Sequence, residues 1–181
     1  APGGGDFSGA LRLEGGWYEL QVRGVFGATM VTTTVDRVGV GEVFVMSGQS
    51  NSANSGSPTQ TPMDDRVSAL KTLTGNIWQH AQDPQPTAAG GSGSPWPAFG
   101  DALAAALDLP VGFASVGVGA TAVAQWLPGT TYYDERLGAA VRGFGTNGFR
   151  AVLWHQGESD SYGTPTATYV ERLQSIIAQT R

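Results

Sequence analysis

The chain has 181 residues, a formal net charge of −5, 40% apolar residues and only 14% charged residues, which is typical of a globular protein with a sparsely charged surface. A single lysine, Lys71, and scattered arginines argue against the clustered positive charge of a nucleic-acid-binding face. Cysteine is absent, two histidines leave little room for a zinc site, and no apolar run reaches the ~20 residues that span a membrane. We therefore expect no nucleic-acid partner, no membrane association, no metal and no cofactor.

The first 40 residues carry the pattern of a β-hairpin. Tyr18, Leu20 and Val22 alternate with polar residues, which is the period of a half-buried strand. After Gly24, the stretch 29–35 is rich in β-branched residues. Because two strands alone are marginally stable in water, we expect this hairpin to pack on the following domain or to be the end of a β-sandwich domain. Residues 41–181 are predicted to form a second domain.

A short apolar run opens that second domain. The run Val43–Met46 is typical of a strand covered on both faces. It leads into the polar turn Gly48-Gln49-Ser50-Asn51, where Gly48 permits a sharp change of direction and Ser50 reaches the edge of the sheet. Ser50 is therefore a candidate nucleophile, although the same four residues also fit a polar loop without a function.

The stretch 54–93 is loop-rich. Pairs such as Ser57-Pro58 and Asp83-Pro84, together with the run 90–93, interrupt regular structure, and only 67–73 and 77–80 fit short strands. So long an irregular region is uncommon in a compact domain. Two interpretations stay open: the region walls a binding cleft, or it decorates the surface.

Helices and strands alternate in the remaining chain. The spacing of apolar residues predicts a helix with Pro97 in its first turn and its apolar face over 99–107, a strand over 111–114, a helix over 137–144 that ends near 145–148, a strand over 151–154, and a last helix with Thr164 as N-cap and Pro165 at its first position. This alternation predicts an α/β fold with a parallel sheet and helices on both faces, in which ligands bind beyond the carboxyl ends of the strands.

Three polar turns follow three of the predicted strands, namely 48–51, 117–121 and 155–158. If the strands are parallel, all three turns lie on the same rim. The N–H groups of Ser50 and Gly119 and the side-chain amide of Gln156 would then be available as donors to an oxyanion. Structural explanations stay open for two of them: Gly119 also fits a turn that needs positive φ, and Gln156 a loop-bracing amide.

The stretches 48–51 and 154–160, with Gly119-Ala120-Thr121 a few residues before Trp126, resemble the sialate O-acetylesterase-like branch of the SGNH (GDSL-type) hydrolases. Ala120 departs from that branch's second glycine. An ordinary α/β-hydrolase is disfavoured, because Ser52 stands where a G-x-S-x-G turn needs glycine.

The resemblance implies a three-layer α/β/α fold and hydrolysis of O-acetyl esters on carbohydrates. Ser50 would be the nucleophile, and its own N–H, Gly119 and Gln156 would form the oxyanion hole. Residues Gln49, Asn51 and Glu158 would have supporting roles. An acetylated carbohydrate is accordingly the expected substrate.

The catalytic base is where the sequence departs from this family, which takes its base from an Asp-x-x-His block near the C-terminus. No such block occurs here. We expect that the chain lacks its C-terminal part, which would persist as a separate fragment of the same protein, and that the chain alone is inactive without it. The alternative bases within the chain are His155, next to Gln156, and His80 in the loop-rich region.

Two other functions compete with an esterase. One is a catalytically inactive carbohydrate-binding protein on the same scaffold, with Trp78, Trp96 and Trp126 as candidates for stacking on sugars or, alternatively, as core residues. The other is a lipase for long acyl chains, which is disfavoured because no apolar lid stretch is evident. The low lysine content and the loops rich in Gly, Ser and Thr favour a secreted or extracytoplasmic location.

Overall fold

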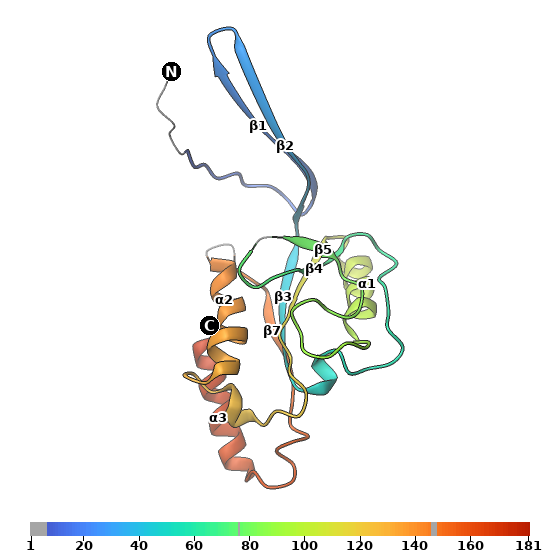
Figure 1. Cartoon of the computed structure of the whole chain (residues 1–181), viewed down its shortest axis with the longest axis vertical. Coiled ribbons are helices and arrows are strands. Elements are labelled where there is room, and N and C mark those ends of the chain that lie inside the picture. Colours follow the sequence, from blue (N-terminus) through green and yellow to red (C-terminus); the bar gives the residue numbers. More distant parts are fainter. Residues whose placement is uncertain (1–6, 76, 146–147) are drawn as a thin grey trace. The chain divides into compact units, whose positions relative to one another are not determined.

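The computed structural model describes residues 7–75, 77–145 and 148–181, and the chain divides into two compact units between Val40 and Gly41 (Figure 1). Part of the expected end of the second helix, residues 146–147, lies outside the described residues.

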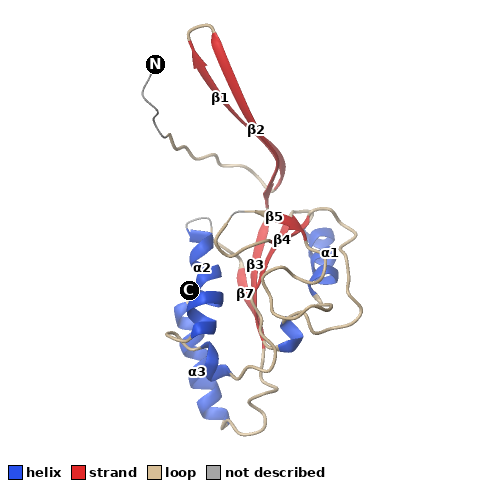
Figure 2. Cartoon of the chain, in the orientation of Figure 1, coloured by secondary structure: helices blue, strands red, loops and turns tan. Residues whose placement is uncertain are grey.

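The first unit contains an antiparallel hairpin of β1 (Gly16–Phe26) and β2 (Thr29–Val40) (Figure 2). The second strand extends well beyond the 29–35 stretch that the sequence predicted. Residues that pair across the strands, such as Leu20 with Val35, place apolar side chains on one face. Val35 on this face is half exposed and Phe26 at the tip two-thirds exposed. The assignment of this hairpin to the end of a β-sandwich domain stays a prediction.

The second unit is built on a five-stranded sheet with the strand order β5-β4-β6-β3-β7. Its elements are β3 (Glu42–Gly48), η1 (Ser50–Ser52), β4 (Val67–Leu70), β5 (Trp78–His80), α1 (Trp96–Leu107), β6 (Val111–Ser115), η2 (Val123–Trp126), the π-helical turn η3 (Tyr133–Leu137), α2 (Gly138–Phe144), β7 (Ala151–His155) and α3 (Thr166–Gln179). The ladders of β3 with β6 and β7 and of β4 with β6 are parallel, whereas β5 is antiparallel to β4. The sheet is therefore mostly parallel. The short strand predicted at 77–80 forms as β5, and its antiparallel direction is the feature that the sequence did not predict.

Helices cover both faces of the sheet, α1 on one and α2 with α3 on the other (Figures 1 and 2). The central strand β3 shows why, because its successive side chains enter opposite cores. Val45 packs with residues of α2 and α3, while Phe44 and Met46 pack with residues of α1 and with Phe113. The predicted three-layer α/β/α architecture is confirmed.

The last helix begins one residue later than the sequence predicted. Helix α3 starts at Thr166, and its N-cap position is occupied by Pro165, with no side-chain cap. The hydroxyl of Thr164 donates instead to the carboxylate of Asp160 at 2.8 Å. The predicted cap was wrong because the helix starts one residue later and the Thr164 side chain is turned toward Asp160.

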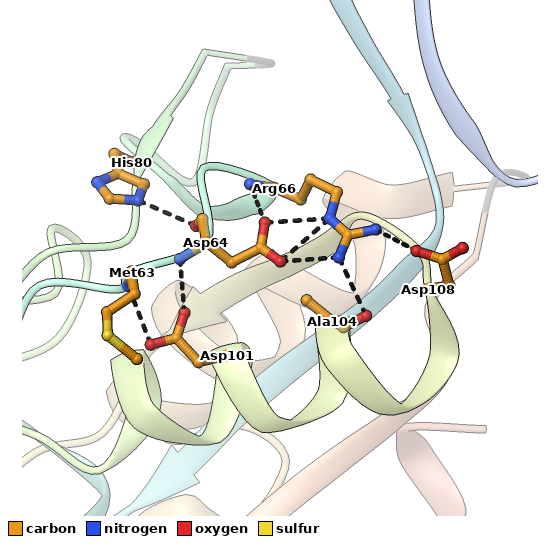
Figure 3. A network of polar contacts seen from close by, with 7 residues as sticks. All are labelled: Met63, Asp64, Arg66, His80, Asp101, Ala104 and Asp108. Carbon is orange, nitrogen blue, oxygen red and sulfur yellow. Dashed lines mark hydrogen bonds and ion pairs between the residues drawn. The ribbon is translucent and has the colours of Figure 1, made fainter.

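A polar network closes the side of the domain opposite the carboxyl ends of the strands (Figure 3). Arg66, directly before β4, binds both carboxylate oxygens of Asp64 and also binds Asp108, directly after α1, at 2.8 Å. The hydrogen bond from Arg66 holds the pKa of Asp64 below its usual value. Asp101 of α1 accepts the N–H of Asp64, and His80 Nε2 lies 3.2 Å from the Asp64 carbonyl oxygen. His80 therefore lies beside the amino end of β4, remote from Ser50, and is excluded as its base.

Candidate active site

The three polar turns meet on one rim, as the sequence predicted. Strands β6, β3 and β7 are neighbours and run parallel, so their carboxyl ends lie together. Backbone hydrogen bonds join the turns directly. The N–H of Val118 donates to the Gly48 carbonyl at 2.9 Å, and the N–H of Gln49 donates to the His155 carbonyl at 2.9 Å.

Ser50 opens the 3-10 turn η1 immediately beyond β3 and is partly exposed. Gly48 has a φ of 129°, and a Cβ at this position would lie 2.0 Å from the His155 carbonyl oxygen. Only glycine fits there. The turn is fixed from below by buried Ser52, whose hydroxyl donates to the Gln49 carbonyl at 2.8 Å and whose carbonyl accepts the indole N–H of Trp96 at 2.9 Å. Ser50 is thus presented on a rigid support.

The second turn brings Gly119 next to Ser50. A Cβ on Gly119 would lie 3.9 Å from the Cβ of Ser50, so the backbone at residue 119 is close to the candidate nucleophile. Ala120 has a φ of 59°, in the left-handed region that favours glycine. Thr121 anchors the end of the turn, because its hydroxyl donates to Val118 and accepts the indole N–H of Trp126 at 2.9 Å. This bond explains the spacing between the threonine and the tryptophan.

The side-chain amide of Gln156 points into the protein. Its Nε2 donates to the carboxylate of Asp160 at 2.6 Å, to the Thr121 carbonyl at 2.8 Å and, more weakly, to the side chain of Gln49 at 3.2 Å. These acceptors occupy the two N–H donors of an amide. The role of Gln156 in an oxyanion hole therefore stays a prediction, and it requires the amide to rotate away from Asp160.

Asp160 is a residue of the candidate site that the sequence did not single out. Its side chain is buried and receives hydrogen bonds from Gln156, from the Val123 N–H at 2.8 Å and from Thr164. Burial raises the pKa of Asp160, but the three donors outweigh it and hold the pKa below its usual value. The sequence could have indicated this residue, because Asp160 is the last residue of the stretch 154–160 and had no assigned role. Asp160 fixes Gln156 and ties η2 to the third turn.

The predicted supporting residues connect the stretch 48–51 to the stretch 154–160. The side-chain oxygen of buried Gln49 accepts the Ser159 N–H at 3.0 Å. The side-chain amide of Asn51 donates to the carboxylate of Glu158 at 2.5 Å. The structure brings Gln49, Asn51 and Glu158 together around Ser50, while their contribution to catalysis stays a prediction.

His155 lies on the same pocket as Ser50, but its imidazole is loosely held. The side chain is 57% exposed, and Nε2 lies 3.8 Å from the nearest carboxylate oxygen of Glu158. This separation is too long for the hydrogen bond that orients a catalytic histidine. A role for His155 as base stays a prediction.

Next to Ser50 lies a pocket of about 390 Å³. The residues that line it are Ser50, Asn51, Ala53, Gly56, Ser57, Pro58, Gln60, Gly93, Ser94, Pro95 and His155. The loop-rich region therefore lines a pocket, which is one of the two roles that the sequence left open. Among the described residues, no three acidic or histidine side chains group as metal ligands, and no helix has the length and apolarity to cross a membrane.

The tryptophans considered either for stacking on sugars or as core residues do not line this pocket. Trp96 and Trp126 are buried core residues, each with its indole N–H bonded to the protein. Trp78 is 37% exposed and packs near Phe144, with ring centroids 6.3 Å apart. The stacking interpretation was wrong for the two buried residues, because a tryptophan with an internal partner for its N–H fills a core well.

Residues 40–181 match the family model "SASA: Carbohydrate esterase, sialic acid-specific acetylesterase". The chain belongs to this carbohydrate esterase family. Membership agrees with the resemblance carried by the motifs around Ser50, Thr121 and Gln156. Among curated proteins, none matches the chain significantly.

Solved structures with the same fold include a protein from Arabidopsis thaliana, with a TM-score of 0.57 and 21% identity over 77% of this chain and 70% of that one. A carbohydrate acetylesterase from Xanthomonas citri has a TM-score of 0.58 and 21% identity over 83% of this chain and 40% of that one. NanS has a TM-score of 0.59 and 14% identity over 77% and 61%. The family member described here thus spans between 40% and 70% of the length of these three chains.

Proposed function

We propose that the protein is a serine esterase that removes O-acetyl groups from carbohydrates, of the sialate or xylan type. The observation that carries this proposal is the placement of Ser50 on a rigid turn, with the Gly119 backbone beside it and a pocket in front. Family membership and the carbohydrate acetylesterase of the same fold support the substrate class.

In the proposed reaction, the hydroxyl oxygen of Ser50 attacks the carbonyl carbon of the acetyl ester while a base removes its proton. The N–H groups of Ser50 and Gly119 bind the developing oxyanion, and each such donor lowers the barrier by about 2.7–4 kcal/mol. Collapse of the tetrahedral intermediate breaks the ester bond, and the sugar hydroxyl leaves with the proton. Water then attacks the acetyl-serine, which releases acetate and restores the Ser50 hydroxyl.

The base in this scheme comes from outside the described rim. We propose that it lies on a separate C-terminal segment of the same protein, in an Asp-x-x-His block, and that the protein acts in a secreted or extracytoplasmic location. Intact mass measured on the undissociated protein tests the first point: a mass equal to that of the 181-residue chain alone contradicts a retained fragment.

Hydrolysis of 4-nitrophenyl acetate by the wild type and by Ser50→Ala tests the proposal. Loss of an active-site serine removes most of the rate, by a factor on the order of 10³ or more. Ser92→Ala is a matched control, since Ser92 is an exposed serine outside the pocket lining. Equal rates in the wild type and Ser50→Ala contradict the assignment of Ser50.

A non-catalytic carbohydrate-binding protein is the second candidate. The observation that favours it is the Gln156 amide, whose donors are engaged by Asp160 and Thr121 instead of the presumed oxyanion position. A wild type that binds acetylated oligosaccharides in a calorimetric titration but leaves them intact supports this candidate over the esterase.

A further inference from the structure

The pocket beside Ser50 is built on two chain segments that a buried carboxylate holds together. Segments 56–60 and 93–95 form the wall opposite the serine. The Asp83 side chain, which is 7% exposed, accepts the backbone N–H groups of Gln60 at 3.1 Å and Ser94 at 2.8 Å, as well as the Ser94 hydroxyl at 2.6 Å. Both segments are therefore fixed to the same carboxylate and share its Oδ2 atom.

Backbone contacts between the segments make the wall rigid. The N–H of Gly56 donates to the Gly93 carbonyl at 2.7 Å, and the N–H of Gly93 donates back at 2.8 Å. A Cβ on Gly93 would lie 2.2 Å from the Pro58 carbonyl oxygen, so the two segments are too close for any residue but glycine at this position. A wall fixed in this way is preorganised for a ligand, because little ordering remains to be done on binding.

The wall side of the pocket carries no charged side chain and mixes polar with apolar surface. The Ser94 hydroxyl and the Gln60 amide nitrogen are bonded within the protein, so the Ser57 hydroxyl and the side-chain oxygen of Gln60 are the polar groups left for sugar hydroxyls, beside the rings of Pro58 and Pro95. The pocket volume of about 390 Å³ lies in the range of small-molecule sites. Sugars with several free hydroxyl groups are thus a chemical match to this surface.

The charge beside the pocket is negative. The Glu158 carboxylate accepts a hydrogen bond from Asn51, which lines the pocket, and lies 3.8 Å from the pocket residue His155. The Asp160 carboxylate lies behind Gln156, with a pKa below its usual value. A ligand that carries its own carboxylate meets like charge here.

We infer that this pocket is the subsite for the alcohol part of the substrate and that it selects uncharged sugars over acidic ones such as sialic acids. The inference rests on the proposed function only for the acetyl ester, and binding of the sugar itself is independent of it. Like charges several Å apart at a protein surface change affinity by a factor on the order of ten.

Titration of the wild type followed by NMR tests the inference with a neutral xylo-oligosaccharide and with N-acetylneuraminic acid. We expect the neutral sugar to bind about tenfold more tightly, with shifts at segments 56–60 and 93–95. Equal or tighter binding of the acid, or shifts confined to other regions, overturns it. Ser57→Lys places a cation in the pocket and is expected to reduce the preference about tenfold. Ser92→Lys, on the exposed surface outside the lining, keeps the preference of the wild type.

Kinetics separate this inference from the proposed function. The acetylated forms of both sugars serve as substrates, and each kcat/KM is divided by the value for 4-nitrophenyl acetate in the same variant. If both are hydrolysed, we expect the higher ratio for the sugar that binds more tightly. Preferred hydrolysis of the acidic sugar refutes the inference and leaves the esterase intact. A third outcome is that the neutral sugar binds more tightly but Ser50→Ala hydrolyses its acetylated form as fast as the wild type does. That outcome supports the inference and refutes the esterase.

Discussion

The Asp160 carboxylate is the sharpest test of how the third motif is held. Two substitutions separate its charge from its hydrogen bonds. Asp160→Asn keeps an oxygen that accepts from Gln156 and Val123, and an amide that donates to the hydroxyl of Thr164. Asp160→Ala removes all three bonds and leaves the buried partners unsatisfied.

The expected losses in the free energy of unfolding follow from these contacts. A neutral hydrogen bond contributes about 1 kcal/mol and a bond to a charged group about 1.5–3 kcal/mol. We therefore expect Asp160→Ala to lose about 3 kcal/mol or more at pH 7 and Asp160→Asn about 1–2 kcal/mol. For a domain of this size, 1 kcal/mol corresponds to about 3 °C in Tm.

The pH dependence of stability tests whether the charge of Asp160 stabilises the fold. Because the pKa of Asp160 is lower in the folded protein than in the unfolded chain, where it is about 3.9, its ionisation stabilises the fold above that value. This contribution is lost as the pH falls through the folded-state pKa. Thermal unfolding followed by circular dichroism should show the Tm difference between wild type and Asp160→Asn narrowing as the pH falls below about 3.9. A Tm difference that is zero at pH 7, or that does not narrow on acidification, would refute the argument.

Three further outcomes are expected. Ala120→Gly should raise the unfolding free energy by about 0.5–1 kcal/mol in urea titrations, because it removes the left-handed backbone cost of alanine; a loss would contradict this. Gly48→Ala should cost about 3 kcal/mol or more, whereas Gly91→Ala, where a Cβ meets open space, should be nearly neutral. His155→Ala should lower kcat for 4-nitrophenyl acetate less than tenfold, since a general base contributes about 10²–10⁴; a loss as large as that of Ser50→Ala would identify His155 as the base.

Sequence alone was sufficient for the layers and for the convergence of the turns. The apolar run at Val43–Met46 and the helical spacing over 99–107 depend on periodicity, which burial on both faces of a parallel sheet imposes directly. Once the strands are parallel, the placement of Ser50 and Gly119 on one rim follows from topology. These predictions needed no knowledge of individual contacts.

Side-chain partners were beyond the reach of the sequence. The side chains of Gln156 and Thr164 both donate to the carboxylate of Asp160, which sets their orientation. A buried charged acceptor attracts nearby donors strongly. The antiparallel direction of the edge strand β5 was likewise hidden, since the pattern that places a short strand at 77–80 does not report the direction in which it pairs. The role of Asp83 in holding the pocket wall arises from residues far apart in the chain, which no local pattern reports.

The rim and the pocket wall together explain why the position of the candidate nucleophile is well defined while that of the base is not. Ser50 is fixed by backbone geometry, through Gly48 and the bonds of Ser52, and such constraints are encoded locally. A base needs a side chain held by a second side chain at a set distance, and His155 with Glu158 at 3.8 Å falls short of it. The exposed imidazole can swing without cost to the fold, whereas Ser50 cannot. The part of the candidate site that rests on backbone is therefore fixed by the fold, whereas the part that needs a pair of side chains, the base and its carboxylate, stays a prediction.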